Sequence, residues 1–301
     1  MILKDLPQSI GIIGLGIMGG TMAKALMAHG HQVVGYDIEA VKRRRLDRMG
    51  GQSTTELTTL LEQCRLLITA LPTPQALLET VHQIASQTKP IKKQVLIETS
   101  TFTLEDKLTA KSILDARKIE MIDAPISGTS HPDPASQWII FVSGGRKTCR
   151  SIEPILRSFS VKAPWVGEFG EGIKLKLVAN HLVAILNVAA AEATAFSQAL
   201  GLNPQTMLEH IGQSPYIGTG LMRIRVPMMI QKKFKPATMK IEVWQKDMDI
   251  IGEMMKSRKF HAPLFQASAS IYDTAQSMGF GDHDTASVSQ VLSPSIRRPR
   301  S

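Results

Sequence analysis

Apolar and polar positions follow different patterns in the two halves of the chain. Up to about residue 165, short apolar runs alternate with longer stretches in which apolar residues recur every three or four positions. The short runs predict buried strands, and the longer period predicts helices. This alternation predicts an α/β domain with a doubly wound parallel sheet. The predicted strands cover 10–13, 32–36, 65–71, 94–98, 120–124 and 138–143, and the predicted helices cover 21–28, 38–49, 57–61, 75–87 and 104–116.

The second half of the chain shows helical periodicity only. It follows a glycine-rich stretch at 166–172, and its predicted helices cover 173–200, 204–211, 222–231, 241–255 and 264–277. Apolar residues occupy most faces of the first of these helices, which predicts burial between domains or subunits and favours a homodimer or homotetramer. The end of the chain is rich in proline and arginine and is expected to be disordered. We therefore expect a first domain at 1–166, an all-α domain at 167–292 and a basic tail at 293–301.

The composition is that of a soluble, cytoplasmic globular protein. Hydrophobic residues make up 43% of the chain and charged residues 20%, which is ordinary for such proteins. No apolar run approaches the roughly 18 to 20 residues of a membrane helix, and no signal-peptide pattern opens the chain. The two cysteines, Cys64 and Cys149, are too few for a disulfide framework and are expected to be reduced thiols.

The net charge of +9 is concentrated in basic clusters at 42–45, 232–233 and 297–300. These clusters contain no interleaved aromatic residues, and aromatic residues make up only 5% of the chain. A stacking platform for single-stranded nucleic acid is therefore not expected. A basic surface instead suits an anionic cofactor and substrate, and we predict no nucleic-acid partner and no membrane partner.

Glycines follow the first predicted strand in the pattern G-x-G-x-x-G. In a dinucleotide site Gly14 would allow the tight turn, Gly16 the close approach of backbone to a pyrophosphate, and Gly19 the close packing of helix on strand. The helix that begins here offers free N–H groups and a positive dipole end to phosphate. The sequence therefore predicts a Rossmann dinucleotide site. The other residues of this loop are Leu15, Ile17 and Met18.

An acidic residue ends the second predicted strand. Asp37 lies about twenty residues past the glycines, where a carboxylate accepts hydrogen bonds from the adenosine ribose. A carboxylate there repels a 2′-phosphate, and Glu39 adds to that repulsion. The basic run from Lys42 comes a few residues too late to form an obvious phosphate clamp. We predict NAD as the cofactor.

The long helix carries a polar stripe. Lys176 and Asn180 are four residues apart and share a face, which Asn187 continues. A lysine in a partly dry cleft can have its pKa lowered toward neutrality, which suits a general acid/base. The alternative is an ordinary lysine that extends from the helix start to the surface. Histidines are scattered without metal-ligand spacing, so no metal site is predicted.

Several motifs occur in a fixed order along nearly the whole chain. The segment 14–19 resembles the cofactor motif of the β-hydroxyacid dehydrogenase family, which includes 3-hydroxyisobutyrate, L-threonate and sulfolactaldehyde-type dehydrogenases and tartronate semialdehyde reductases. The segment 123–129 resembles the family's substrate motif D-A-P-V-S-G-G, and 246–247 its later K-D pair. The signature G-x-x-G-x-G-x-x-x-K-x-x-x-N is matched by Gly167, Gly170, Gly172, Lys176 and Asn180.

The resemblance implies a fold, an activity and residue roles. The second domain would have the all-α fold of 6-phosphogluconate dehydrogenase, and the protein would move a hydride between NAD and a small β-hydroxy acid. Lys176 would be the general acid/base, and Asn180 would orient the substrate. The remaining implied roles are carboxylate binding by Ser127, Gly128 and Thr129, cofactor contacts by Leu71, Pro72, Thr101 and Lys246, and support of the cleft by Asp247.

Plainer interpretations stand beside these roles. Gly128 could simply shape a turn, and Lys246 and Asp247 could form a solvated helix pair. The sequence departs from the family at Thr129, at 130–134 and at His181, which leaves the substrate open between 3-hydroxyisobutyrate-, threonate-, tartronate semialdehyde- and sulfolactaldehyde-like compounds. A catalytically inactive cofactor-binding scaffold and an imine reductase are the alternatives. The presence of Lys176 argues against both.

Overall fold

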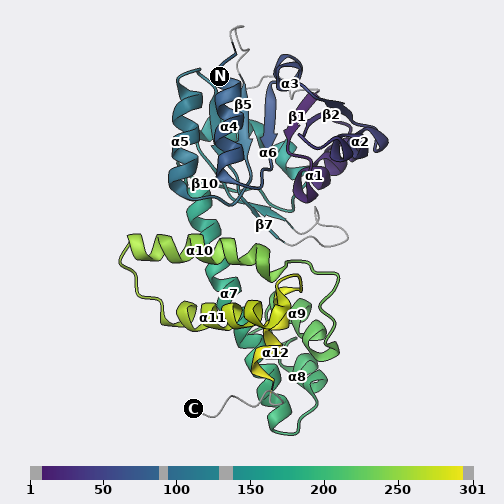
Figure 1. Cartoon of the computed structure of the whole chain (residues 1–301), viewed down its shortest axis with the longest axis vertical. Helices are drawn as coiled ribbons and strands as arrows, with labels where there is room; N and C mark the ends of the chain where they lie inside the picture. Colours follow the sequence, from purple (N-terminus) through teal and green to yellow (C-terminus); the bar gives the residue numbers. More distant parts are fainter. Residues whose placement is uncertain (1–8, 88–93, 129–137, 294–301) are drawn as a thin grey trace. The chain divides into compact units, whose positions relative to one another are not determined.

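The computed structural model describes residues 9–87, 94–128 and 138–293 of the chain (Figure 1). The chain divides into two compact units, Met1–Lys176 and Leu177–Ser301. The boundary between the units falls inside a single long helix, α7 (Glu171–Ala199). The tail predicted at 293–301 lies outside the described residues except for Ser293.

The first unit is built on an eight-stranded sheet in the order β10-β9-β6-β5-β4-β1-β2-β3. Neighbouring strands pair in parallel, except that β6 and β9 pair antiparallel at Asp123 and Ser143. This confirms the doubly wound, mostly parallel sheet. The strands are β1 (Ser9–Ile13), β2 (Gln32–Tyr36), β3 (Gln52–Thr54), β4 (Leu66–Thr69), β5 (Val95–Glu98), β6 (Glu120–Asp123), β9 (Val142–Ser143) and β10 (Trp165–Gly167), with β7 (Ile126–Ser127) and β8 (Ile139–Ile140) in a separate pair.

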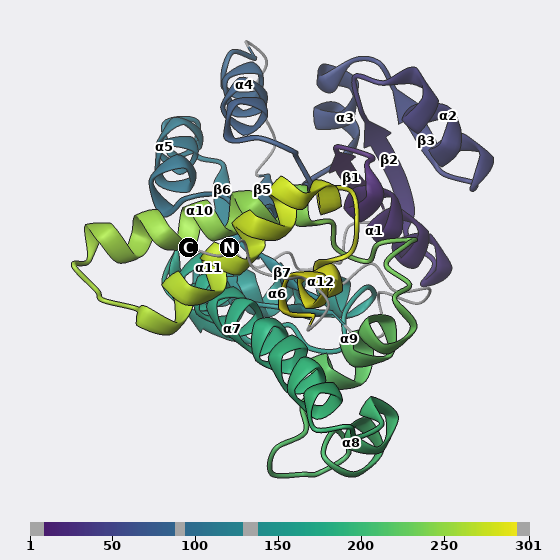
Figure 2. The same cartoon turned by 60° about the horizontal axis from the view of Figure 1, so that its bottom comes forward.

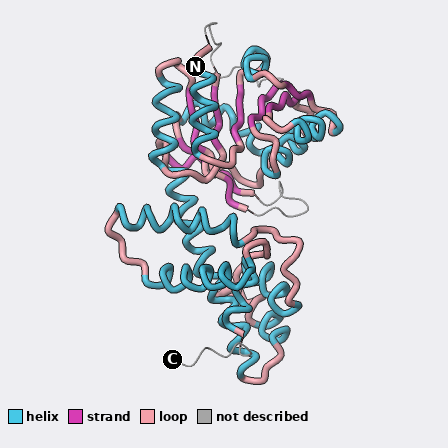
Figure 3. Tube along the Cα trace, viewed as in Figure 1, coloured by secondary structure: helices cyan, strands magenta, loops and turns pink. Residues whose placement is uncertain are grey.

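Helices cover both faces of this sheet, because its strands are apolar on both faces (Figure 3). Ile10 and Ile12 of β1 belong to the core on the side of α1, α2 and α6. Ile13 of the same strand belongs to the core on the side of α3, α4 and α5. These helices are α1 (Ile17–Ala28), α2 (Ala40–Arg48), α3 (Leu57–Gln63), α4 (Pro74–Ala85), α5 (Leu104–Asp115) and α6 (Arg146–Arg157).

The structure corrects the prediction for 138–143. We expected one strand, but β8 pairs with β7 and β9 joins the main sheet. The chain changes partners at Phe141, whose N–H donates to Pro125 O at 3.1 Å. β3 and β10 were not predicted because three residues are too few to show a strand period. α6 was not predicted either, and it contains Pro154, which in a sequence marks a helix break.

The described residues of the second unit form helices and loops and no strand (Figure 3). This confirms an all-helical second half. α10 and α11 lie side by side in Figures 1 and 2. Asn187 of α7 donates to Tyr272 Oη and to Thr285 O, both at 2.9 Å, and so ties three elements together. Besides α7, the elements are α8 (Pro204–His210), α9 (Gly220–Gln231), α10 (Ile241–Ser257), α11 (Pro263–Ala275), the π-helical turn η1 (Gln276–Phe280), the 3₁₀ turn η2 (Thr285–Val288) and α12 (Ser289–Leu292).

α7 is less buried in the single chain than its apolar composition suggests. Val178, Leu182 and Phe196 are 57%, 51% and 63% exposed. Among the described residues α7 is also long and apolar enough to cross a membrane, a test that core helices of soluble proteins pass as well. Its buried Asn187 is hydrogen-bonded inside the helical unit, as expected of a core helix.

Candidate active site

The glycine loop between β1 and α1 is shaped by close backbone contacts. Gly14 has φ +92°, and a Cβ there would collide with Ala70 O. A Cβ on Gly19 would collide with Gly14 O, so this glycine lets α1 lie against the loop. At Gly16, by contrast, a Cβ would meet no atom within 4 Å. Among the described residues no atom fills the space beside Gly16, and this space would allow a ligand to approach the backbone closely.

The first turn of α1 is open to an anion. Its N-cap is Gly16, and no side chain caps the helix N–H groups. α4 and α5 are capped instead by Thr73 and Thr103, whose hydroxyls accept N–H bonds of 3.1 Å. Ile17, the first residue of α1, is 71% exposed. The free N–H groups and the open space beside Gly16 fit the pyrophosphate of a dinucleotide.

Asp37 braces this loop from the end of β2. Its Oδ2 accepts the N–H of Leu15 at 2.7 Å, its Oδ1 accepts the N–H of Glu39 at 2.8 Å, and the residue is 6% exposed. The basic run at 42–45 lies closer to Asp37 than the sequence suggests, because α2 starts at Ala40 and its first turn brings Lys42 and Arg43 to Asp37. Lys42 Nζ is 3.9 Å from Asp37 Oδ2, and Arg43 donates to Asp37 O at 2.6 Å.

The ends of β4 and β5 carry the next predicted cofactor residues. The N–H of Leu71 donates to Ser100 Oγ at 3.0 Å, and Pro72 beside it is exposed. The N–H of Ser100 in turn donates to Glu98 Oε1 at 2.7 Å, which fixes the loop that continues to the half-buried Thr101. β4 is the neighbour of β1 in the sheet, and β5 is the next strand beyond β4. Residues from four strand ends are thus gathered at one edge, where ligands of such sheets bind.

A buried charge cluster, which our sequence analysis did not predict, connects α5 with the ends of β5 and β6. Lys107, Glu98 and Asp123 are all 0% exposed. Lys107 Nζ is 2.5 Å from Glu98 Oε2 and 2.7 Å from Asp123 Oδ1. Burial by itself lowers the pKa of Lys107, but the attraction of the two carboxylates outweighs burial and raises it. The lysine is therefore charged at neutral pH.

Asp123 also holds the beginning of α7. Its Oδ2 accepts the N–H of Ile173 at 2.8 Å and the hydroxyl of Ser143 at 2.9 Å. Ser143 Oγ accepts the N–H groups of Gly170 at 3.2 Å and Gly172 at 2.9 Å. A Cβ on Gly172 would collide with Phe141 O, which explains the last glycine of the motif. Lys176 follows Ile173 by three residues and is only 7% exposed.

The predicted substrate loop is described in part. Ser127 is half-buried at the end of β7, and Gly128 follows it. A Cβ on Gly128 would collide with the Trp138 ring, so packing alone requires glycine there. Thr129 and the unusual segment 130–134 lie outside the described residues.

The second unit supplies the remaining predicted residues. Asn180 is 3% exposed and donates to Asp247 Oδ2 at 2.8 Å, which joins α7 to α10. Lys246 is exposed, with its Nζ 3.8 Å from Asp247 Oδ1. The hydrogen bond from Asn180 means that Asp247 fixes the amide of Asn180. His181, one of the departures from the family pattern, has its ring centroid 5.7 Å from that of Phe265.

Other candidate sites are minor. No group of three or more His, Cys, Asp or Glu residues with metal-binding geometry occurs in the described part of the chain. Burial raises the pKa of both cysteine thiols to about 12, so neither is a reactive thiolate at neutral pH.

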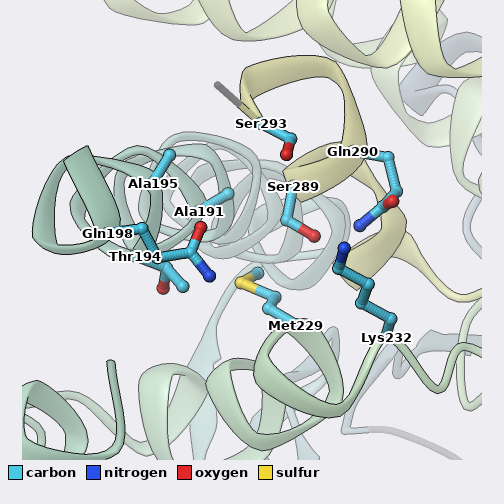
Figure 4. A pocket seen from close by; sticks show the side chains of 9 residues that line it. All are labelled: Ala191, Thr194, Ala195, Gln198, Met229, Lys232, Ser289, Gln290 and Ser293. Carbon is cyan, nitrogen blue, oxygen red and sulfur yellow. The ribbon is translucent and has the colours of Figure 1, made fainter. Parts of the chain in front are cut away.

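A small pocket lies between α7, α9 and α12 (Figure 4), and it contains none of the predicted site residues. It is lined by Ala191, Thr194, Ala195, Gln198, Met229, Lys232, Ser289, Gln290 and Ser293.

Two family models match the chain one after the other. The first, the NAD binding domain of 6-phosphogluconate dehydrogenase, matches residues 9–167, more than half of the chain. The second, described as the NAD-binding domain of NADP-dependent 3-hydroxyisobutyrate dehydrogenase, matches residues 170–292.

Individual proteins resemble the chain along nearly its whole length. It is 26% identical to glyoxylate/succinic semialdehyde reductase 2 of Arabidopsis thaliana, over 94% of this chain and 79% of that protein. It is 25% identical to L-threonate dehydrogenase of Cupriavidus necator, over 97% and 98% of the two chains. The structure of 3-hydroxyisobutyrate dehydrogenase from Mycobacterium tuberculosis superposes with a TM-score of 0.85 at 23% identity, covering 95% of this chain and 99% of that one. That last likeness concerns the fold.

Proposed function

The chain belongs to the 3-hydroxyisobutyrate dehydrogenase-like family of β-hydroxyacid dehydrogenases, and from this premise we propose that it transfers a hydride between NAD and the hydroxyl-bearing carbon of a small β-hydroxy acid. As a family member it is an NAD(P)-binding oxidoreductase that acts on CH–OH groups. NAD as the preferred cofactor and Lys176 as the acid/base are the specific parts of the proposal.

The observation that carries the proposal is the burial of Lys176. Lysine is almost never fully buried without a reason, and this one is 7% exposed near the start of α7. When bound, the nicotinamide would accept or supply the hydride. In the oxidation direction the neutral amine of Lys176 takes the proton of the substrate hydroxyl, and in the reduction direction its ammonium returns a proton to the carbonyl oxygen.

Neighbouring groups would position the substrate. Asn180, whose amide is fixed by Asp247, would hydrogen-bond the reacting oxygen from one turn along α7. Ser127, Gly128 and Thr129 would hold the substrate carboxylate through hydroxyl and backbone N–H groups.

Asp37 and Glu39 support NAD over NADP, because two carboxylates at the adenosine ribose repel a 2′-phosphate. Leu71, Pro72 and Thr101 would lie along the cofactor, and Lys246 would reach it from α10. Lys42 and Arg43 reduce this electrostatic preference, since both reach Asp37. NADP turnover equal to that with NAD would count against the proposed preference.

A screen for NAD reduction tests the activity. The compounds are 3-hydroxyisobutyrate, L-threonate, glycerate, 4-hydroxybutyrate and sulfonate analogues, with glyoxylate and succinic semialdehyde assayed in the reverse direction with NADH. We expect Lys176→Ala to retain NADH binding and to lose at least a hundredfold in kcat. Cyclic imines serve as the control for an imine reductase. Turnover of imines, or a salt-sensitive DNA complex without any turnover, would favour the alternatives.

We also propose a cytoplasmic homodimer or homotetramer. Val178, Leu182 and Phe196 lie on α7 and are more than half exposed, although apolar side chains on a core helix are normally covered. A second copy of the chain would cover them.

A further inference from the structure

The buried network around Lys107 connects two parts of the proposed active site. On one side Glu98 accepts the N–H of Ser100, and Ser100 accepts the N–H of Leu71, in loops that we assign to the cofactor. On the other side Asp123 accepts the N–H of Ile173 at the beginning of α7. Lys107 contacts both carboxylates. One lysine thus joins the cofactor loops to the helix that carries Lys176.

The charges of this network match the end of the helix. Two carboxylates and one ammonium leave one negative charge in a region that is 0% exposed at all three residues. The positive end of the α7 dipole points at that charge, because Asp123 accepts the N–H of Ile173. The N–H of Ile173 therefore helps to stabilise this charge where α7 begins. The same contact that stabilises the carboxylate therefore fixes the position of the helix along its axis.

Ser143 adds a second set of bonds to the same turn. Its hydroxyl donates to Asp123 and accepts from Gly170 and Gly172. Gly172 has no room for a side chain, because a Cβ would also come within 2.8 Å of Asp123 Oδ2. Three backbone N–H groups at the start of α7, those of Gly170, Gly172 and Ile173, are held by two side chains of the sheet. Lys176 lies just beyond them, in the next turn of the same helix.

We infer that Asp123 and Ser143 are positioning residues for catalysis, which hold Lys176 at a fixed place relative to the cofactor loops. This inference rests on the proposed role of Lys176. General acid/base catalysis requires the amine within hydrogen-bond reach of the substrate oxygen, and small displacements of catalytic groups cost large factors in rate. A polar network that only stabilised the unit would have no such effect.

Ser143→Ala tests the inference, with Ser160→Ala as a matched control. Both serines are buried in the first unit, but Ser160 donates to Leu156 O and has no bond to α7. We expect Ser143→Ala to lower kcat at least tenfold in the full-length protein, with the KM and the Kd for NADH changed less than twofold. Ser160→Ala should leave all three within twofold of wild type. The substrate is the compound of the screen above that the wild type turns over fastest.

Hydrogen exchange measures, without any substrate, how strongly Asp123 and Ser143 hold the backbone at the start of α7. The amides of Gly172 and Ile173 should exchange about tenfold faster in Ser143→Ala than in wild type or in Ser160→Ala. If kcat or the exchange rates are the same in the two serine variants, the inference is wrong. If Ser143→Ala does not fold, Asp123→Asn must show the same loss of kcat at unchanged NADH affinity, and failure to do so refutes it. Retained turnover in Lys176→Ala refutes the proposed role of the lysine instead, and this result is independent of the serine variants.

Discussion

Replacement of Lys107 by methionine should destabilise the first unit by about 4 kcal/mol at pH 7. Methionine fills similar space but removes the ammonium, which lies 2.5 Å from Glu98 Oε2 and 2.7 Å from Asp123 Oδ1. Each attraction is worth about 6 kcal/mol at an effective dielectric constant of about 20, before desolvation is subtracted. Removal of one partner from a buried pair typically costs about 3–5 kcal/mol.

The variant can limit this cost by taking up a proton. A buried carboxylate without a partner becomes neutral rather than staying charged. To protonate an ordinary carboxyl group of pKa about 4 costs about 4 kcal/mol at pH 7, at about 1.4 kcal/mol per pH unit. Above pH 4 the folded variant then binds one proton more than its unfolded chain, so its stability falls as the pH rises. At pH 5 the difference from wild type should shrink to about 1.5 kcal/mol.

Denaturant unfolding of the wild type and the variant at pH 5 and pH 7, followed by tryptophan fluorescence, measures these values. The control is Lys111→Met, one turn further along α5, whose ion pair with Asp115 is 2.5 Å long but solvent-exposed. An exposed pair of this kind contributes about 0.5 kcal/mol or less. Equal stability of the two variants at pH 7, or a deficit in Lys107→Met that does not change with pH, would refute the reasoning.

Two further predictions concern the cofactor loop and α7. Gly16→Ala should leave the melting temperature within about 2 °C of wild type, because the added methyl group meets no atom within 4 Å, yet raise the Kd for NADH more than tenfold in a fluorescence titration. The control, Gly19→Ala, should lower the melting temperature, because its methyl group collides with Gly14 O. If the affinity for NADH falls in both variants only as far as the melting temperature falls, Gly16 is not a cofactor contact. Leu182→Glu places a charge on a residue that is 51% exposed in the single chain, so light scattering should show a monomer with little change in secondary structure; an unchanged mass would place the subunit contact elsewhere.

The hydrophobic pattern was sufficient for the architecture but not for the edges of the sheet. β1, β2, β4, β5 and β6 each contain a short run of buried residues that is mostly apolar, and these runs were sufficient to predict the strands. At Phe141 the chain changes from one sheet to the other, and this depends on long-range bonds to Pro125 and Pro164 that no local pattern records. The long helix was predicted within two residues of its observed ends, because its apolar run is long enough to show the helical period.

Some residues of the candidate site could be predicted from local sequence, whereas others depend on contacts between distant parts of the chain. Gly14, Gly16 and Gly19 lie within one loop, and their spacing alone indicates their task. Lys107 occupies the apolar face of α5, three and seven residues before the buried Ala110 and Leu114. A lysine on such a face is a sequence signal for a buried charge, but its partners come from two different strands and could not be named in advance. The motif D-A-P pointed to Asp123 as a substrate-loop residue, whereas its observed hydrogen bonds lead to the helix of Lys176. The sequence therefore indicates which residues matter locally, and only the fold shows that an acid at a strand end and a helix fifty residues later act together.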